Sequence, residues 1–333
     1  MTLKRKESDD DSDFEEEQKS PKRAYIKPRQ EVWQPLNELK EKSRTSGVIP
    51  RLKQSFTHRG TVNAYLCSPS TDHITTGFMD LGWGCGYRNC QMLMSFLERH
   101  EQDGDYLLKH VPDITGLQVL IEEAWKEGFD PSGAAQLKHS VLRTRKWIGT
   151  TEVYTLLAYL GIRSTIIDFH NPGPGKLHTK LMDWVQSYFM EGESNEHVHI
   201  TNKPPLYLQH QGHSRTIIGI EVLKSGKRNL IMFDPGRRTL RSYRMNHRKE
   251  EGVSSSSGHH HRHFFSRIKN SFPSALLRPY RVDEKAISKN KQYQILVLGQ
   301  VDAKSGLTWN GEMGYILKEE QREMMKTVTS LTL

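Results

Sequence analysis

The sequence predicts an α+β domain in which a long helix headed by Cys85 packs on a mainly antiparallel sheet. Helical patterns dominate the first half of the chain, and short strands rich in Ile, Leu, Val and Tyr dominate the second half. A length of 333 residues is enough for one large domain with a sizeable core. Apolar residues at 35% and charged residues at 26% are typical of a folded, enzyme-sized chain and exclude a fibrous protein.

The helix at Cys85 is predicted from a change of pattern. Three glycines between residues 82 and 86 prevent regular structure before the cysteine. The apolar residues that follow, from Cys90 to Leu97, have the spacing of a buried helix, so we expect Cys85 at its N-terminus. Further amphipathic helices are predicted over 116–128, over 151–160 with a Thr N-cap, and over 177–189.

The predicted strands cover 163–169, 205–211, 216–222, 230–233 and 293–298. If the third and fourth of these form a hairpin that turns around residues 224–228, the position opposite His213 falls at Asp234 or just beyond it. The two side chains are therefore expected at one end of the sheet.

Composition divides the chain into a charged tail (1–30), a helical arm (31–60), a main domain (61–315) and a C-terminal helix or tail (316–333). A basic, His- and Ser-rich insertion interrupts the main domain at about 237–290. Residues 237–291 hold fourteen Lys and Arg against four Asp and Glu, which accounts for the net charge of +9. Two interpretations of this insertion stay open. It could make weak contact with nucleic acid or another polyanion, or it could be a solvated loop without such a role, and we favour the solvated loop. The histidines of the insertion lack the fixed scaffold that a metal site needs.

Location is predicted from what the sequence lacks. The longest apolar run is far too short to cross a bilayer, and the charged N-terminus has no apolar leader, so we expect a protein of the nucleus and/or cytoplasm with no membrane contact. Two basic clusters, Lys4–Lys6 and Pro21–Arg23, fit either a nuclear import address or an ordinary charged tail. Three unpaired cysteines indicate neither a disulfide framework nor a zinc site.

Cys85 is the candidate nucleophile. A helix N-terminus lowers the pKa of a thiol, its amides can hold a developing oxyanion, and the neighbouring glycines would let a substrate backbone approach. Cys67 and Cys90 lack this setting. His213 is the candidate base and Asp234 the acceptor that orients it. Together they predict a cysteine hydrolase that needs no cofactor or metal, with a non-catalytic binding module as the alternative.

The residues also carry a family resemblance. The stretch Asp80–Asn89, with its Gly-Trp-Gly-Cys-Gly-Tyr-Arg-Asn core, resembles the nucleophile motif of the peptidase family that includes the ubiquitin-fold-modifier-specific proteases and the zinc finger-containing ubiquitin peptidase. Residues 147–153, 168–170, 205–216 and 234–236 are similar to the latter, deubiquitinase branch, in which the histidine precedes an Asp-Pro-Gly. The Cys/His spacing of that branch's zinc fingers is absent from this sequence. The resemblance implies a papain-like fold with Cys85 as nucleophile, His213 as base and Asp234 as acid.

The resemblance further implies a substrate: ubiquitin or a ubiquitin-like modifier, cleaved from its conjugates after the C-terminal glycine. Asp130 and Glu152 would hold the arginines of ubiquitin's basic tail, while Trp83 and the adjacent glycines would admit its Gly-Gly end. Without the resemblance, the two carboxylates are a turn acid and a helix N-terminal charge. Two alternatives stay open: a protease for the ubiquitin-fold modifier, and a non-catalytic ubiquitin- or nucleic-acid-binding protein.

Overall fold

The computed structural model describes residues 32–33, 35–56, 60–170, 172–173, 175–190, 196–238, 276–303 and 306–333. The charged tail 1–30 and the basic insertion from 239 to 275 lie outside these residues, so the interpretations given to them stay predictions. Within the described ranges no helix combines the length and the apolar character that a membrane span requires.

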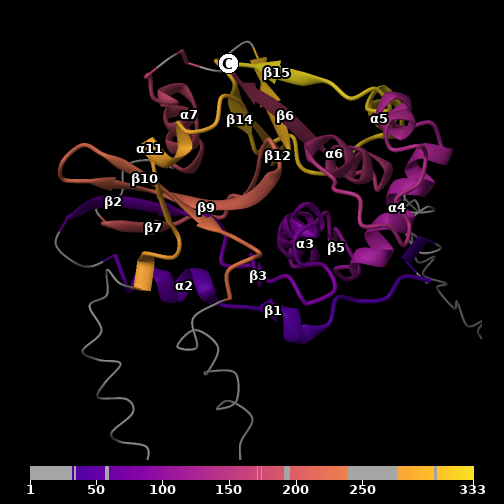
Figure 1. Ribbon diagram of the computed structural model, residues 1–333, viewed down its shortest axis with the longest axis horizontal. Coiled ribbons are helices and arrows are strands. Elements are labelled where there is room, and N and C mark those ends of the chain that lie inside the picture. Colours follow the sequence, from indigo (N-terminus) through magenta and orange to yellow (C-terminus); the bar gives the residue numbers. More distant parts are fainter. Residues whose placement is uncertain are drawn as a thin grey trace, which may run out of the picture.

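One mixed, mainly antiparallel sheet dominates the described part of the chain (Figure 1). Seven of its nine strands follow the order β11-β10-β9-β8-β12-β6-β15, while β2 pairs with β9 and with β7. Two strand pairs are parallel, β15 with β6 and β2 with β7, and the others are antiparallel. The strands are β2 (Thr61–Leu66), β6 (Ser164–Phe169), β7 (Val198–Ile200), β8 (Leu206–His210), β9 (His213–Leu223), β10 (Arg228–Phe233), β11 (Arg281–Asp283), β12 (Tyr293–Leu298) and β15 (Ser330–Thr332).

The long strand β9 organises the sheet. One edge of β9 pairs with β10, and its other edge pairs first with β8 and then with β2. Six small strands form three separate pairs: β1 (Arg44–Thr45) with β3 (His73–Ile74), β4 (Glu101–Gln102) with β5 (Asp105–Tyr106), and β13 (Gln300–Asp302) with β14 (Thr308–Asn310).

Helices cover both faces of the sheet (Figure 1). Thr150 of α6 bonds to Gln294 of β12, whereas Trp184 of α7 contacts Phe169 of β6. Gln294 pairs with Asp168, whose side chain points to the face opposite that of Phe169, so α6 and α7 lie on opposite faces. The helices are η1 (Glu41–Ser43), α2 (Val48–Lys53), α3 (Cys85–Glu98), α4 (Ile114–Lys126), α5 (Pro131–Gln136), α6 (Thr150–Tyr159), α7 (Thr179–Phe189), α11 (Glu284–Ile287) and α12 (Glu319–Met324).

Helix α3 is almost entirely buried, with every residue from Gly86 to Leu97 inside the protein. It packs on β9 and also contacts α4 and α6. Its polar side chains are hydrogen-bonded, as burial demands: Gln91 donates to the Pro112 carbonyl at 2.7 Å, and Ser95 donates to the Met92 carbonyl at 2.7 Å. The predicted fold class is confirmed: the helix that begins at Cys85 packs on a mainly antiparallel sheet.

Three features differ from the predicted organisation. The arm 31–60 is no continuous helix, because η1, β1 and α2 follow one another. Of these three elements only α2 buries apolar residues, namely Val48, Ile49 and Leu52. The helix predicted over 151–160 begins at Thr150, with Gly149 rather than a threonine as its N-cap. The last part of the basic insertion, β11 and α11, belongs to the sheet and its cover, and the C-terminal segment contributes β15 besides α12.

Candidate active site

Cys85 is the first residue of α3, and Gly84 precedes it as the N-cap. The loop before the helix is fixed by Asp80, whose carboxylate accepts hydrogen bonds from the Arg88 guanidinium at 2.7 and 2.9 Å. The backbone N–H of Gly77 donates to the same carboxylate at 2.9 Å. This buried pair fixes the point at which the chain enters the helix, so the thiol stays at the end where backbone amides are unpaired.

The glycines of the motif have different roles. A Cβ at Gly84 would lie 2.7 Å from the Cβ of Asp80, and one at Gly86 would lie 2.3 Å from the Ile148 carbonyl oxygen. Gly82 has a φ of +86° and open space around it. Two of the three glycines therefore accommodate the protein's own packing, and Gly82 alone faces free space. That these glycines also admit a substrate stays a prediction.

His213 is held by a tight hairpin. Strands β8 and β9 pair up to His210 and His213, which leaves Gln211 and Gly212 as the two turn residues. Gly212 has a φ of +82°, the left-handed conformation that such a turn requires. His213 is therefore the first residue of the central strand of the sheet and is half-buried.

Asp234 follows β10 directly and comes to lie beside His213. The antiparallel register of β9 and β10 pairs Phe233 with Thr216. Asp234, the next residue along the chain, therefore comes to the level of Arg215. His213 Nε2 lies 3.7 Å from Asp234 Oδ2, and Arg215 Nε donates to the same oxygen at 3.0 Å. The hairpin that the sequence predicts thus brings His213 and Asp234 together at one end of the sheet.

The three groups shift one another's pKa. Burial raises the pKa of the Cys85 thiol, but hydrogen bonds with His213 and Ser214 outweigh burial and lower it to about 7. Hydrogen bonding to Asp234 and to Cys85 raises the pKa of His213 to about 9, against the effect of burial. Burial also opposes ionisation of Asp234, yet hydrogen bonding with His213 and the charge of Arg215 hold its pKa well below the usual range. Between about pH 7 and 9 the site therefore favours a thiolate next to an imidazolium.

The other two cysteines are buried and inert. Burial raises the pKa of Cys67 to about 12, and it raises the pKa of Cys90 to about 12 as well. A thiol with such a pKa carries almost no thiolate at neutral pH, so the contrast with Cys85 that the sequence predicts is reproduced by the structure.

Two buried polar residues that the sequence patterns do not single out lie next to these groups. Asn89 sits one turn after Cys85 and donates to the Cys85 carbonyl oxygen at 2.8 Å. It also donates to the Ser214 hydroxyl at 3.1 Å. The spacing of four residues after Cys85, which places two side chains on one helix face, is the signal that could have found Asn89.

Trp83 stands half-buried in the loop before Cys85. Its ring packs edge-on against Tyr87 with 5.7 Å between centroids, and its Nε1 donates to the Met79 carbonyl at 3.0 Å. On the other side of the hairpin turn, the ring of Trp147 lies 3.7 Å from the position that a Cβ would take at Gly212. One tryptophan therefore belongs to the loop before Cys85, and another contacts the turn that precedes His213.

Asp130 and Glu152 have the local roles expected of helix-start carboxylates. Asp130 Oδ1 accepts from the backbone N–H of Gly133 at 3.0 Å, and Glu152 Oε2 accepts from that of Gly149 at 2.7 Å. Asp130 Oδ2 is buried without a hydrogen-bond partner. Burial, together with the nearby charge of Asp130, raises the pKa of Glu152. The two carboxylates thus repel each other inside the protein, which is the setting in which a basic ligand would be stabilised.

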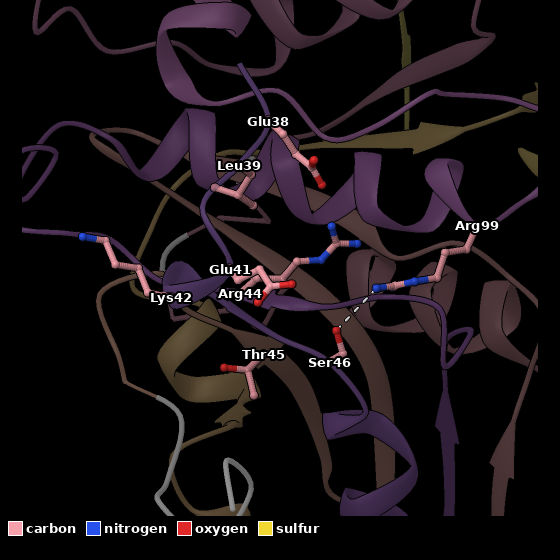
Figure 2. A pocket seen from close by; sticks show the side chains of 8 residues that line it. All are labelled: Glu38, Leu39, Glu41, Lys42, Arg44, Thr45, Ser46 and Arg99. Carbon is pink, nitrogen blue, oxygen red and sulfur yellow. Dashed lines mark hydrogen bonds between the residues drawn. The ribbon is translucent and has the colours of Figure 1, made fainter. Parts of the chain in front are cut away.

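The described residues contain no cluster of three or more His, Cys, Asp or Glu that could hold a metal ion. A pocket of about 520 Å³ lies elsewhere, between the segment 38–46 and Arg99 (Figure 2). Its arginines are already paired: Arg44 with Asp72 and Glu98, and Arg99 with Asp72 at 2.7 Å and with the Ser46 hydroxyl. Cys85, His213 and Asp234 do not line this pocket, so we do not place the candidate active site in it.

Several known proteins are similar in sequence to parts of this chain. The chain is 47% identical over 199 residues to the zinc finger-containing ubiquitin peptidase 1 of Bos taurus, which covers 59% of this chain and 34% of that protein. It is 34% identical over 201 residues to the ubiquitin carboxyl-terminal hydrolase mug105 of Schizosaccharomyces pombe, covering 58% of this chain and 76% of that one. A probable Ufm1-specific protease 1 of Drosophila melanogaster is 31% identical over 84 residues, 25% of this chain and 30% of its own.

The chain thus spans about a third of the length of the zinc finger-containing relatives that it matches. Among solved structures, the crystal structure of UfSP from C. elegans matches with a TM-score of 0.40 and 15% identity, covering 74% of this chain and 36% of that one. Residues 60–296, most of the chain, match peptidase family C78. The predicted resemblance is confirmed: this chain belongs to peptidase family C78.

Proposed function

We propose that this chain is a deubiquitinase that cleaves ubiquitin from its conjugates after the C-terminal glycine. The observation that carries the proposal is the meeting of three groups from separate elements: the thiol of Cys85, the imidazole of His213 and the carboxylate of Asp234. Nothing about the packing of a sheet on a helix requires a thiol, an imidazole and a carboxylate to converge, whereas thiol peptidase chemistry does.

The reaction follows from the charges of the site. The Cys85 thiolate attacks the carbonyl carbon of the terminal glycine, and the backbone amides at the start of α3 stabilise the oxyanion. The His213 imidazolium gives its proton to the leaving amine, which leaves a thioester on Cys85. His213, now neutral, takes a proton from water as the water attacks the thioester. Collapse expels the Cys85 thiolate and restores the thiolate–imidazolium pair, and the released glycine carboxylic acid loses its proton to solvent.

The carboxylate pair, Asp130 and Glu152, supports ubiquitin as the substrate. No ion pair within the described ranges uses either carboxylate. Burial is the main cause of the raised pKa of Glu152, and the charge of Asp130 adds a smaller repulsion. A basic tail would relieve that repulsion, and ubiquitin ends in a basic, glycine-terminated tail.

A folded protein substrate is also supported by the apolar loop, by which we mean Phe78, Met79 and Leu81. These side chains are 93%, 71% and 67% exposed, although they stand only a few residues before the nucleophile. Between them, Asp80 is buried and ion-paired to Arg88, so the loop is fixed and its apolar side chains cannot turn inward together. Fixed apolar side chains in water are typical of surfaces that contact another protein.

The test is a pair of covalent probes, ubiquitin and the ubiquitin-fold modifier, each with a thiol-reactive group in place of its terminal carboxylate. We expect the ubiquitin probe to label the chain, and Cys85→Ala to abolish labelling while the circular dichroism spectrum is unchanged. Labelling by the modifier probe alone would instead identify the second candidate, a protease for that modifier, which the Drosophila relative favours. Ubiquitin binding without labelling by either probe would indicate the non-catalytic alternative.

A further inference from the structure

We propose that Asn89 is a positioning residue for the thiol reaction: it ties the first turn of α3 to strand β9 and holds the Ser214 hydroxyl in place to donate to the Cys85 sulfur. This inference rests on the proposed role of Cys85 as a nucleophile. It adds two residues to the site, one that contacts the reacting atom and one that acts through it.

The Asn89 side chain is fully buried. Each of its hydrogen bonds either joins α3 to β9 or stabilises the first turn of α3. Its amide nitrogen donates to the Cys85 carbonyl at 2.8 Å and to Ser214 Oγ at 3.1 Å, and its amide oxygen accepts from Thr216 Oγ1 at 2.7 Å. Three hydrogen bonds of good length in a dry interior fix both the position and the orientation of the amide group.

The direction of these bonds determines what Ser214 can do. Because Ser214 Oγ accepts the Asn89 N–H, its own proton is free to be donated elsewhere. Hydrogen bonding with Ser214 is among the causes that favour ionisation of Cys85, and it comes from the backbone as well as from the side chain. A hydroxyl that donates to a thiolate forms a charge-assisted hydrogen bond, which is stronger than the bond to the neutral thiol. Ser214 therefore stabilises the nucleophilic form selectively.

The same connection sets the spacing between nucleophile and base. Ser214 is adjacent to His213 in β9, and Thr216 lies on the same face of the strand two residues later. Asn89 contacts both while also bonding to the backbone of Cys85, so the distance from the thiol to the imidazole is fixed through a short path. A helix packed on a sheet by apolar contacts alone can slide, whereas a triply bonded amide cannot slide without losing buried hydrogen bonds.

The other titratable groups close to the thiol do not replace this contact. On β8, burial raises the pKa of Tyr207 well above its ordinary value, although hydrogen bonding with Ser214 acts against it, so Tyr207 stays neutral. The Ser214 hydroxyl is therefore within reach of Tyr207 as well as of Cys85, and only the bond to Cys85 involves a group that ionises near neutral pH. Cys90, in the same helix, is protonated at neutral pH. His213 is the cation that faces the thiol, and Ser214 is the neutral donor.

The experiment measures how fast iodoacetamide alkylates Cys85 as a function of pH, with the modified peptide identified by mass spectrometry. Alkylation reports thiolate and needs no knowledge of the substrate. We expect Ser214→Ala to move the rise in alkylation rate upward by roughly half to one pH unit, since one charge-assisted donor is lost. Thr216→Val should produce a smaller upward shift because it frees one end of Asn89, and Thr216→Ser should restore the original profile.

Ser95→Ala is the matched control. Ser95 is equally buried and lies on the same helix, but its hydroxyl bonds to the Met92 carbonyl and accepts from the Asp72 backbone, away from the thiol. It should lower the melting temperature comparably and leave the alkylation profile unchanged. A Ser214→Ala profile that superimposes on the original, or a Ser95→Ala shift of equal size, would overturn the proposal. If neither modifier probe reacts but the Ser214 shift is found, the deubiquitinase assignment fails and this inference stands.

Discussion

Arg215 Nε lies 3.0 Å from Asp234 Oδ2, closer than the 3.7 Å that separate the same oxygen from His213 Nε2. The acceptor that should orient the base is therefore shared with a permanent cation. Arg215 helps to keep Asp234 ionised, but it also competes with the imidazolium for one carboxylate oxygen and repels its charge.

Removing this competitor should strengthen the bond between His213 and Asp234. We expect Arg215→Gln to move the basic limb of the activity profile upward by about half a pH unit, because the imidazolium gains an acceptor and loses a repelling neighbour. The measurement is kcat/KM against pH with a ubiquitin C-terminal fluorogenic substrate. Arg237→Gln is the comparison, since Arg237 Nε is 3.9 Å from the same oxygen and more exposed. A downward movement of the limb would show that Arg215 supports the base rather than competing with it.

The pKa directions predict a bell-shaped pH profile. Below about pH 7 Cys85 becomes protonated, and above about pH 9 His213 loses the proton that the leaving amine needs, so activity should fall on both sides. Asp234→Asn removes the charge that raises the His213 pKa, and the basic limb should move toward neutral pH while the acidic limb changes less. Activity that kept rising beyond pH 9 in the unmodified protein would contradict the thiolate–imidazolium pair.

The carboxylate pair predicts a binding effect without a chemical one. Asp130→Asn keeps the oxygen that caps α5 and suits the left-handed backbone at this position, where φ is +44°. It removes one negative charge, so KM for a substrate with a basic tail should rise by about three- to tenfold while kcat stays within about twofold. Steady-state kinetics at two salt concentrations checks this. The KM difference should shrink at high salt, and an unchanged KM would show that Asp130 does not bind the basic tail.

The apolar loop predicts a difference between long and short substrates. Phe78→Ser should lower kcat/KM for a whole modifier by about five- to tenfold, because an exposed aromatic ring no longer becomes buried on binding. A short peptide with the same C-terminal tail does not reach the loop and should be cleaved at the original rate. Val62→Ser, also at an exposed apolar residue but on β2, serves as the control. Equal losses with both substrates would mean that the substitution disturbs the nucleophile loop itself.

The sequence by itself determined the elements and the candidates. The change from glycines to a helical apolar pattern located the start of α3 at Cys85, and alternation with β-branched residues located β8, β9, β10 and β12 to within a few residues. These signals are local, because they depend on side chains one or two turns apart. Short elements such as β15 were missed, since three residues carry no period and β15 exists only by pairing with β6 far away in the chain.

The tertiary structure alone decided which contacts the candidate residues form with one another and with their neighbours. Whether Asp234 bonds to His213 or to Arg215 depends on fractions of an ångström in the β9–β10 register, which includes a bulge at Ile231/Met232. No periodicity in the sequence reports such a shift. The bridge from Asn89 to Ser214 joins residues separated by 125 positions, and only the packing of helix on sheet brings them into hydrogen-bonding distance. Burial then fixes the charge of each group, because desolvation and partners act through space rather than along the chain.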